Sequence, residues 1–364
     1  MKLAFIVDGY DPNTAMGKYL LSFCQELGSV YHVDTIIIAA YVRPYSLRNL
    51  PPNMEIVTST IVDGPVSDVG WRIFLDYYLG WIGRKLSGLV RKTNADCFIH
   101  ASSCGWSAIN EKNSTPMGYF CNGLAYASFF SEPWYRDLSV SPLIKLPLKL
   151  STPLISSKMY KMGQKFDFFL SNSNFTKEHL FSHLGFHSQK VYLPVDVSFY
   201  SPGLTSNFGN YFLVVGNSSE IEFDTVEELA RSNPVVHVGR KSIPYCDNRG
   251  YVTNEELVSL YQGARATIYP HYQEPFGMVP IESMACGTPV LTYSYQGPGE
   301  TVLDEVTGWT VDTRNQLMQK GQEIFRQGVT GEMRQHCREH VLNNFSPNVC
   351  THQLLDNLVM FSHL

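Results

Sequence analysis

The sequence predicts an α/β protein made of two doubly wound domains that face each other across a cleft. Short runs of β-branched and aromatic residues alternate with longer helix-like segments, which is typical of doubly wound sheets. These runs are too apolar for a half-exposed sheet and suit parallel strands that are buried on both faces. With 364 residues, 44% of them hydrophobic and 17% charged, the chain is long enough for two cores.

The first series of elements begins at the strand KLAFIV (2–7), which a helix follows through GKYLLSFCQELG (17–28). Further strands are predicted at VDTIII (33–38), CFIH (97–100), MGYFC (117–121), DFFLS (167–171) and KVYL (190–193).

The pattern breaks into Pro, Gly, Ser and Asn at LPVDVSFYSPGLTSNFGN (193–210), which is typical of a linker. A second α/β series follows, with strands predicted at YFLVV (211–215), VVHV (235–238), ATIY (266–269) and PVLT (289–292). Ligands of such sheets bind beyond the carboxyl ends of the strands, so we expect a site there.

Composition predicts a soluble, cytoplasmic protein without nucleic-acid partners. The net charge of −5 gives no reason to expect nucleic-acid binding. The eight cysteines form no C-x-x-C pair or metal spacing and suit reduced, mostly buried thiols. The opening apolar run is too short for a signal peptide, and no stretch is long enough for a membrane span. The sequons are therefore interpreted as chance matches: Asn113, Asn174, Asn217 and Asn344.

The stretch YPHYQEPFGMVPIESMACGTPV (269–290) carries the strongest chemical signal. It predicts a strand, a loop and a helix from Met278, with Glu274 on the loop and Glu282 just over one turn inside the helix. Gly277 allows a ligand close to the backbone, and the free N–H groups at the helix start suit a phosphate. Two carboxylates that flank a phosphate site can accept hydrogen bonds from sugar hydroxyls. A ligand that carries both phosphate and sugar hydroxyls is a nucleotide sugar.

The segment EPFGMVPIESMACGTPV resembles the E-x7-E signature of the retaining GT-B glycosyltransferases of family four, the glycosyl transferases group 1. The resemblance covers nearly the whole chain, through LSNSNFTKEHL, YLPVDVSFYSP, NRGYVTNEELVSLYQGA, YSYQGPGETVLDEVTGWTV and NNFSPNVCTHQLLDNLVMF. It implies two Rossmann-like domains, an acceptor-side domain (1–200) closed by a C-terminal helix (345–364) and a domain that binds the nucleotide sugar (205–344).

The resemblance also implies roles for single residues. Glu274 would bind hydroxyls of the donor sugar and Glu282 the ribose. The backbone at Phe276, Gly277, Met278 and Val279 would hold the sugar and diphosphate. DPNTAMGKYL (11–20) matches the glycine-rich loop after the first strand, which places Met16 and Gly17 against the phosphates and acceptor. Gly216 and Asn217, which follow the first strand of the second domain, are expected on the donor as well.

Two departures from the family pattern concern the catalytic groups. The family usually carries an Arg and a Lys where this chain reads VVGNSSEIEFDTVEEL (214–229), which has no basic residue. Arg240 and Lys241 could supply that charge from a neighbouring strand end, and Arg265, which precedes a strand, is a weaker candidate. Asn122 stands where many relatives have a His, and it can bind a hydroxyl but cannot carry a proton.

Blander interpretations exist for each of these residues. The two glutamates could be surface carboxylates, Gly17 a turn residue, and Arg240 with Lys241 a solvated strand end. His100, which ends the strand CFIH, suits a buried histidine as well as a cleft residue. A glycosidase would need a facing acid and nucleophile, and no such pair is set here.

Two segments suggest peripheral contact with the inner face of a membrane. SPLIKLPLKLSTPLISSKMYKMGQK (141–165) carries five lysines and no acid, which suits an anionic surface and a lipid-linked acceptor. DVGWRIFLDYYLGWIGRKLSGLVRK (68–92) is rich in aromatics, although at helical spacing these also suit a core or a pocket wall.

The sequence thus predicts a metal-independent, retaining hexosyltransferase of glycan biosynthesis that uses a UDP- or GDP-linked sugar. Its acceptor would be a sugar, a lipid-linked glycan or another hydroxyl. Two alternatives stay open: a non-catalytic GT-B subunit that binds sugars or a partner transferase, and a phosphorylase or epimerase on the same fold.

Overall fold

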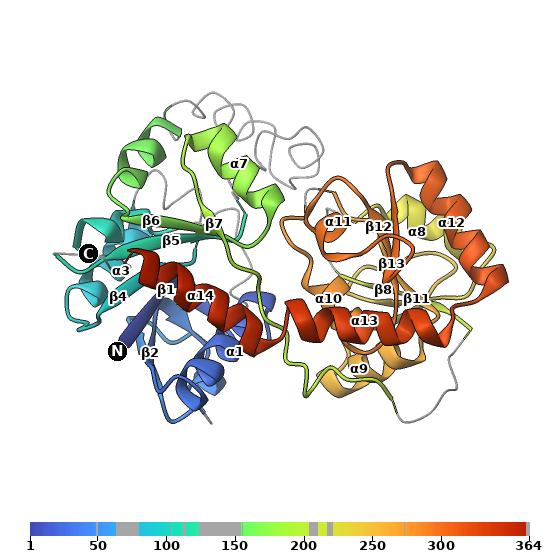
Figure 1. Ribbon diagram of the computed structural model, residues 1–364, viewed down its shortest axis with the longest axis horizontal. Coiled ribbons are helices and arrows are strands. Elements are labelled where there is room, and N and C mark those ends of the chain that lie inside the picture. The colour runs from blue at the N-terminus through green and yellow to red at the C-terminus, as the bar shows by residue number, and fades with distance from the viewer. Residues whose placement is uncertain are drawn as a thin grey trace. The chain divides into compact units, whose positions relative to one another are not determined.

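The chain forms two compact units. The computed structural model describes residues 1–48, 50–62, 80–102, 104–111, 114–123, 154, 156–203, 210–216, 221–272 and 274–361. The first unit comprises Met1–Pro194 and Cys350–Leu364, and the second comprises Val195–Val349 (Figure 1).

The first unit is built on a seven-stranded parallel sheet with the order β3-β2-β1-β4-β5-β6-β7. Its strands are β1 (Lys2–Tyr10), β2 (Asp34–Val42), β3 (Met54–Thr58), β4 (Cys97–His100), β5 (Met117–Cys121), β6 (Phe168–Ser171) and β7 (Gln189–Lys190).

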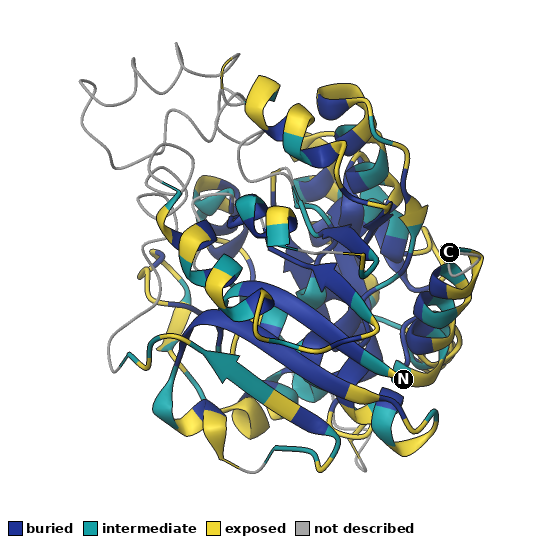
Figure 2. Cartoon of the chain, turned by 90° about the vertical axis from the view of Figure 1, so that its left-hand side faces the viewer, coloured by how far each residue is buried: buried dark blue, intermediate teal, exposed yellow. Residues whose placement is uncertain are grey.

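Helices α1 (Ala15–Ser29), α3 (Trp81–Val90) and α7 (Asn174–Leu184) belong to the same unit. Figure 2 shows the central strands in dark blue, with alternating buried and exposed positions along the helices. The end of α14 (Pro347–Phe361) returns to this unit, where Phe361 stacks on Phe168 with ring centroids 4.9 Å apart.

The second unit has a six-stranded parallel sheet with the order β10-β9-β8-β11-β12-β13. Its strands are β8 (Phe212–Val215), β9 (Val235–Val238), β10 (Asp247–Gly250), β11 (Ala266–Tyr269), β12 (Val290–Tyr293) and β13 (Gly308–Val311). Its helices are α8 (Phe223–Ala230), α9 (Asn254–Gly263), α10 (Met278–Ala285), α11 (Gly297–Thr301), α12 (Arg314–Gln327), α13 (Gly331–Asn344) and the start of α14.

Each sheet has a switch point at which the strand order reverses, between β1 and β4 in the first unit and between β8 and β11 in the second. Loops at the carboxyl ends of the two central strands diverge there and leave room for a ligand. The loop after β11 is the motif loop that the sequence singled out. The doubly wound α/β prediction is therefore confirmed, and it places the motif at the switch point of the second sheet.

The central strands agree with the prediction, whereas the edge strands β3, β7 and β13 do not. CFIH, VVHV and ATIY coincide with β4, β9 and β11, whereas the strand predicted at 190–193 shortens to Gln189–Lys190. The sequence missed β3 and β13. Both are edge strands, and β3 buries only its first residue fully, so it lacks the continuous apolar run of a central strand.

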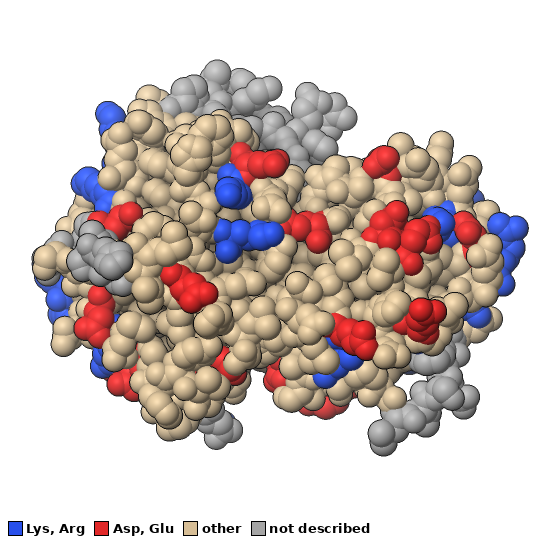
Figure 3. Space-filling model, viewed as in Figure 1, with Lys and Arg blue, Asp and Glu red and all other residues tan. Residues whose placement is uncertain are grey.

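The surface carries few charges, as the composition predicts. On the face drawn in Figure 3, acidic and basic side chains lie singly or in small groups among uncharged residues. All eight cysteines are thiols and six of them are buried, so the expectation of mostly buried thiols is confirmed. Among the described helices, none is long and apolar enough to cross a membrane.

The two segments considered for membrane contact lie largely outside the described residues. Where the aromatic segment is described, Ile82 and Leu86 of α3 are buried, but Trp81 is 43% exposed and is not a core residue. The Lys85 ammonium lies 5.0 Å from the Trp81 ring centroid, so this partly exposed ring makes a cation–π contact.

Candidate functional site

The motif loop connects β11 to α10 through a left-handed turn. Gly277, the residue before the helix, has φ +89°, and a Cβ there would lie 2.8 Å from Cγ of Pro298. Both the backbone conformation and this close approach require glycine. The turn therefore directs the first amides of α10 to the carboxyl edge of the sheet.

Glu274 folds back onto its own loop. Its Oε1 accepts hydrogen bonds from the amides of Gly277 (3.1 Å) and Phe276 (3.4 Å), and its Oε2 accepts one from the Tyr269 hydroxyl (3.2 Å). Burial raises the pKa of Glu274, and the bonds from Phe276, Tyr269 and Gly277 oppose that rise. Of the four amides expected to face a phosphate, two are thus bonded to this carboxylate.

Unlike the amides of Phe276 and Gly277, the amides of Met278 and Val279 do not donate to Glu274. Within the described part of the chain neither has a hydrogen-bond partner, and Pro280, the next residue, has no N–H. The first amides of a helix point outward and carry the positive end of its dipole. This end of α10 can therefore bind an anion such as a phosphate.

The segment after β12 holds the loop in place. The side chain of Gln296 accepts from the Glu274 amide at 2.9 Å and donates to the carbonyl of His271. The amide of Gly297 donates to the Glu274 carbonyl at 3.1 Å. The backbone of Glu274 is therefore fixed on both sides, while Oε2 of its carboxylate accepts only the Tyr269 hydroxyl among the described residues.

His271 is a site residue that the sequence reasoning missed. Its ring is 3% exposed and stacks on Tyr269 with centroids 3.7 Å apart and an interplanar angle of 16°. Burial lowers its pKa to about 3, so the ring is neutral at physiological pH. Its place directly after Pro270, at the carboxyl end of β11, was the signal that could have found it.

Glu282 lies inside the second unit, with 4% of its surface exposed. The hydroxyl of Tyr261 donates to its Oε2 at 3.1 Å, and the Tyr200 hydroxyl also hydrogen-bonds it. Burial and the negative charge of Glu282 raise the pKa of both tyrosines. The second motif glutamate is thus already bonded to two hydroxyls, and its role toward a ribose stays a prediction.

Two arginines of α13 hold the carboxyl end of α10. Arg338 donates to the carbonyls of Ala285 (2.9 Å), Tyr200 (2.7 Å) and Val197 (2.8 Å). Arg334 is 7% exposed and donates to the carbonyl of Gly287 at 3.2 Å, among other acceptors. These guanidinium groups satisfy carbonyls at the negative end of α10 and beside it.

The residues expected to neutralise a diphosphate lie at the ends of β8 and β9. The amide of Gly216 donates to the Val238 carbonyl at 3.0 Å, and Asn217 lies outside the described residues. The exposed Arg240 guanidinium carbon is 5.0 Å from the Tyr251 ring centroid, and Lys241 Nζ is 3.8 Å from that of Phe223. Both cations therefore rest on aromatic rings at the expected edge of the sheet.

Arg265 is not a candidate for this role. It lies directly before β11, at the amino edge of the sheet, where its guanidinium donates to the Phe325 carbonyl and packs on the Phe325 ring.

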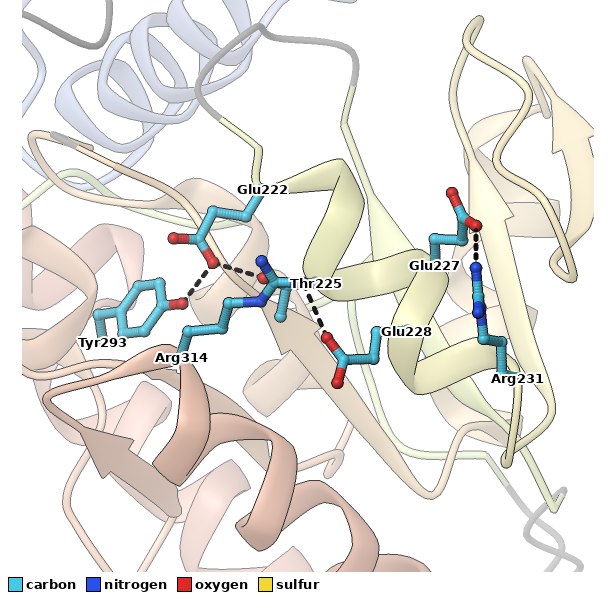
Figure 4. A network of polar contacts seen from close by, with 7 residues as sticks. All are labelled: Glu222, Thr225, Glu227, Glu228, Arg231, Tyr293 and Arg314. Carbon is cyan, nitrogen blue, oxygen red and sulfur yellow. Dashed lines mark hydrogen bonds and ion pairs between the residues drawn. The ribbon is translucent and has the colours of Figure 1, made fainter.

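A carboxylate occupies the region where the family pattern has its cations. Glu222 precedes α8, and its amide donates to the Pro270 carbonyl at 2.9 Å, which ties it to the end of β11. Its Oε2 accepts from the hydroxyls of Tyr293 (2.5 Å) and Thr225 (2.7 Å) (Figure 4). Residues 214–229 therefore not only lack the Arg and Lys of the family pattern but also place a carboxylate at this edge of the sheet.

In the first unit, Gly17 lies in the first turn of α1. A Cβ on Gly17 would lie 1.9 Å from the carbonyl oxygen of Asp11, and its amide donates to Thr14 Oγ1 at 3.1 Å. The close packing of the turn after β1 therefore requires this glycine without any ligand. Met16, one residue earlier, is half-buried.

Asn122 follows β5 and is hydrogen-bonded within the first unit. Its Nδ2 donates to the Tyr19 hydroxyl at 2.8 Å and to the Ala101 carbonyl at 3.3 Å. His100 is fully buried between aromatic rings, and burial lowers its pKa to about 4. His100 is thus a core histidine.

In the described part of the chain, no group of three or more His, Cys, Asp or Glu side chains could hold a metal ion. Whether the chain acts without a metal stays a prediction.

Residues 247–341 match the model described as glycosyl transferases group 1, and this range contains β11, the motif loop and α10. This part of the second unit is therefore similar to the group 1 glycosyl transferases.

Curated glycosyltransferases match this chain over short segments. A D-inositol 3-phosphate glycosyltransferase of Nocardiopsis dassonvillei is 41% identical over 88 residues, which are 24% of this chain and 19% of that protein. A glycogen synthase of Mycobacterium tuberculosis is 41% identical over 59 residues, 16% of this chain and 14% of that protein. The matched part is therefore less than a fifth of the length of either relative.

Solved structures match this chain along its whole length. The sucrose-phosphate synthase of Thermosynechococcus elongatus has a TM-score of 0.76 at 17% identity and covers 100% of this chain and 99% of that one. The Anabaena protein HepE, in complex with UDP-glucose, has a TM-score of 0.67 at 12% identity. The match covers 99% of this chain and 100% of that one. The fold is GT-B, as the resemblance implies.

The contacts of Arg338 predict a loss of stability when its guanidinium is removed. The variant Arg338→Met keeps much of the apolar stem but leaves three carbonyls without their charged donor, so unfolding should need about 2 kcal/mol less. Urea denaturation measures this, with Arg326→Met on α12 as the control, since among the described residues Arg326 donates only to the Gln322 carbonyl of its own helix. Equal stability of the two variants would contradict the assigned role.

His271 predicts a pH dependence of stability. Its pKa falls from 6.5 to about 3 on folding, so between these values the unfolded chain binds the proton and the folded chain does not. The contribution is full above pH 6.5 and is lost as the pH falls, by about 2 kcal/mol between pH 6.5 and pH 5.

The variant His271→Gln should remove that part of the pH dependence, and His100→Gln should remove a separate part in the first unit. Denaturant unfolding at several pH values measures both. A His271→Gln profile parallel to the wild type would show that the ring is not held neutral.

Proposed function

We propose that this chain is a retaining glycosyltransferase that moves a hexose-type unit from a nucleotide diphosphate sugar to a hydroxyl acceptor. The observation that carries the proposal is the pair of open amides at Met278 and Val279, with the Glu274 carboxylate beside them, in a region similar to the group 1 glycosyl transferases. UDP or GDP is the expected nucleotide, and the UDP-glucose held by HepE supports a nucleotide-sugar donor.

The open end of α10 would receive the diphosphate. When the bond between the anomeric carbon and the diphosphate oxygen breaks, negative charge develops on the leaving group. Amides that already point at this charge stabilise it without reorganising. The helix dipole adds to them, and a site of this kind needs no metal ion to hold the phosphate.

Glu274 would bind hydroxyls of the transferred sugar. Its Oε1 is occupied by backbone amides, whereas Oε2 can accept further hydrogen bonds besides that of Tyr269. Positive charge that develops on the sugar ring also favours a nearby carboxylate. The acceptor oxygen would bond to the anomeric carbon on the face that the diphosphate leaves, and its proton would depart with the diphosphate.

Further charge would come from the end of β9. Arg240 and Lys241 are exposed and lie on aromatic rings, so either side chain can turn toward an anion at small cost in burial. Asn122, Met16 and Gly17 keep their expected roles in the first unit, and Glu282 keeps its role toward the ribose. A lipid-linked acceptor and contact with the inner face of a membrane complete the proposal.

One observation favours the alternative of a non-catalytic sugar-binding subunit. Glu222 provides a carboxylate where the family pattern has cations. A chain that binds nucleotide and sugar but releases no nucleotide would belong to that alternative.

A thermal-shift panel of UDP, GDP and their sugars tests the donor site, because ligand binding to the folded state raises the melting temperature. Glu274→Ala should lose the extra shift given by the sugar and keep the shift of the bare nucleotide. Glu274→Gln, which keeps an oxygen for the Gly277 amide, should lose at least about a hundredfold in transfer rate.

Glu255→Gln on the exposed side of α9 is the matched control and should behave as wild type. Equal loss of both shifts in Glu274→Ala would mean that the residue acts on the nucleotide or on loop stability instead.

Removal of a single backbone amide tests the diphosphate site. Met278→Pro deletes one of the two open N–H groups at a helix position where proline is well tolerated. The affinity for UDP or GDP should fall at least about tenfold, since a hydrogen bond to a charged group is lost. Calorimetric titration measures this, with Met278→Leu as the control that keeps the amide. Unchanged affinity in the proline variant would place the diphosphate elsewhere.

A further inference from the structure

Three tyrosines stand together beyond the carboxyl ends of β11 and β12. The ring of Tyr293, 1% exposed, lies between those of Tyr272 and Tyr295, with centroid distances of 6.1 Å and 5.4 Å and interplanar angles of 13° and 24°. The outer two rings are 36% and 50% exposed. The buried ring of Tyr293 thus stacks on two rings that remain partly open to solvent.

Glu222 adds a carboxylate to these rings. Tyr293 and Thr225 both donate to Oε2, so that oxygen has its hydrogen bonds. Oε1 accepts none from the described residues, and in Figure 4 the two dashed lines of the Glu222 carboxylate start from the same oxygen. Arg314, the cation drawn beside it, is ion-paired with Glu228 at 2.8 Å. One oxygen of a half-buried carboxylate is therefore available to a ligand.

The chemistry of this cluster limits what can bind. Its negative charge disfavours a phosphate. Guanine presents two adjacent N–H donors and would need both carboxylate oxygens, but only Oε1 is open. A sugar ring has an apolar face of C–H groups that packs on an aromatic ring, and a hydroxyl that donates to a single oxygen. A neutral hexose fits both groups.

We propose that Tyr272, Tyr295 and Glu222 form a subsite for a neutral hexose unit of the acceptor glycan. This inference rests on the proposed function and deepens it by assigning the acceptor class. Besides the acceptor-side domain expected at residues 1–200, a group of residues on the second unit would then also bind the acceptor. The donor sugar has its own carboxylate in Glu274, two residues after Tyr272, so a second carboxylate with exposed rings serves another sugar. The exposure of the outer rings suits a glycan that stays partly in solvent while one unit is held.

Saturation-transfer NMR on the full chain, in the presence of UDP, tests the subsite. The probes are methyl α-D-glucopyranoside, methyl α-D-mannopyranoside and methyl β-D-galactopyranoside, each titrated separately. At least one should bind to the wild type. Its affinity should fall about fivefold or more in Tyr272→Ala, Tyr295→Ala and Glu222→Gln, through loss of ring contact or of the charged acceptor.

Two matched controls come from the same unit. Tyr245→Ala removes a tyrosine that is 65% exposed and lies apart from the cluster, and Glu227→Gln neutralises a carboxylate of the same helix that pairs with Arg231 (Figure 4). Both should bind the glycoside as the wild type does. Thermal shifts with UDP and GDP, recorded on every variant, should stay at the wild-type value.

Three results would overturn the subsite: no glycoside binds the wild type, the cluster variants bind as well as the controls, or nucleotide binding is lost while glycoside binding remains. The last result would assign the rings to the nucleobase. Failure of the proposed function has a different signature, because the wild type would then show no shift with any nucleotide or nucleotide sugar, whatever the glycoside titrations give.

Discussion

The candidate site depends on the way α10 is held at one end and open at the other. Arg338 and Arg334 bind carbonyls at and beside its carboxyl end, and inside the helix Ser283 bonds Thr267 Oγ1 at 2.7 Å. Nothing comparable covers the amides of Met278 and Val279 among the described residues. A helix fixed in this way keeps its amino end in one place, which an anion site made of backbone amides requires.

Much of this arrangement could be predicted from local sequence. Gly277, Pro280 and the apolar positions of the motif predict the turn and the start of α10, and the buried runs predict the central strands of both sheets. Such features depend on residues close together in the chain. The edge strands β3 and β13 were missed because their apolar pattern is weak and their pairing is set by tertiary contacts.

The partners of the charged groups could not be predicted in the same way. Nothing local shows that Glu274 bonds Phe276 and Gly277, that Tyr200 reaches Glu282, or that Arg338 bonds carbonyls more than fifty residues away. These contacts depend on side-chain conformations chosen by the packed structure. Gly17 is a further case that local sequence could not resolve. Its position in the motif implies a ligand, whereas close packing against the Asp11 carbonyl already requires a glycine there.

The carboxylate of Glu222 has a consequence for the kinetics of ligand capture. The carboxylates of Glu222 and Glu274 offset the two positive charges of Arg240 and Lys241. In a chain with a net charge of −5, the site therefore offers a dianion little electrostatic steering. Encounter is then left to diffusion and orientation. The rate of capture should vary little with ionic strength, and selectivity would reside in how long a ligand stays.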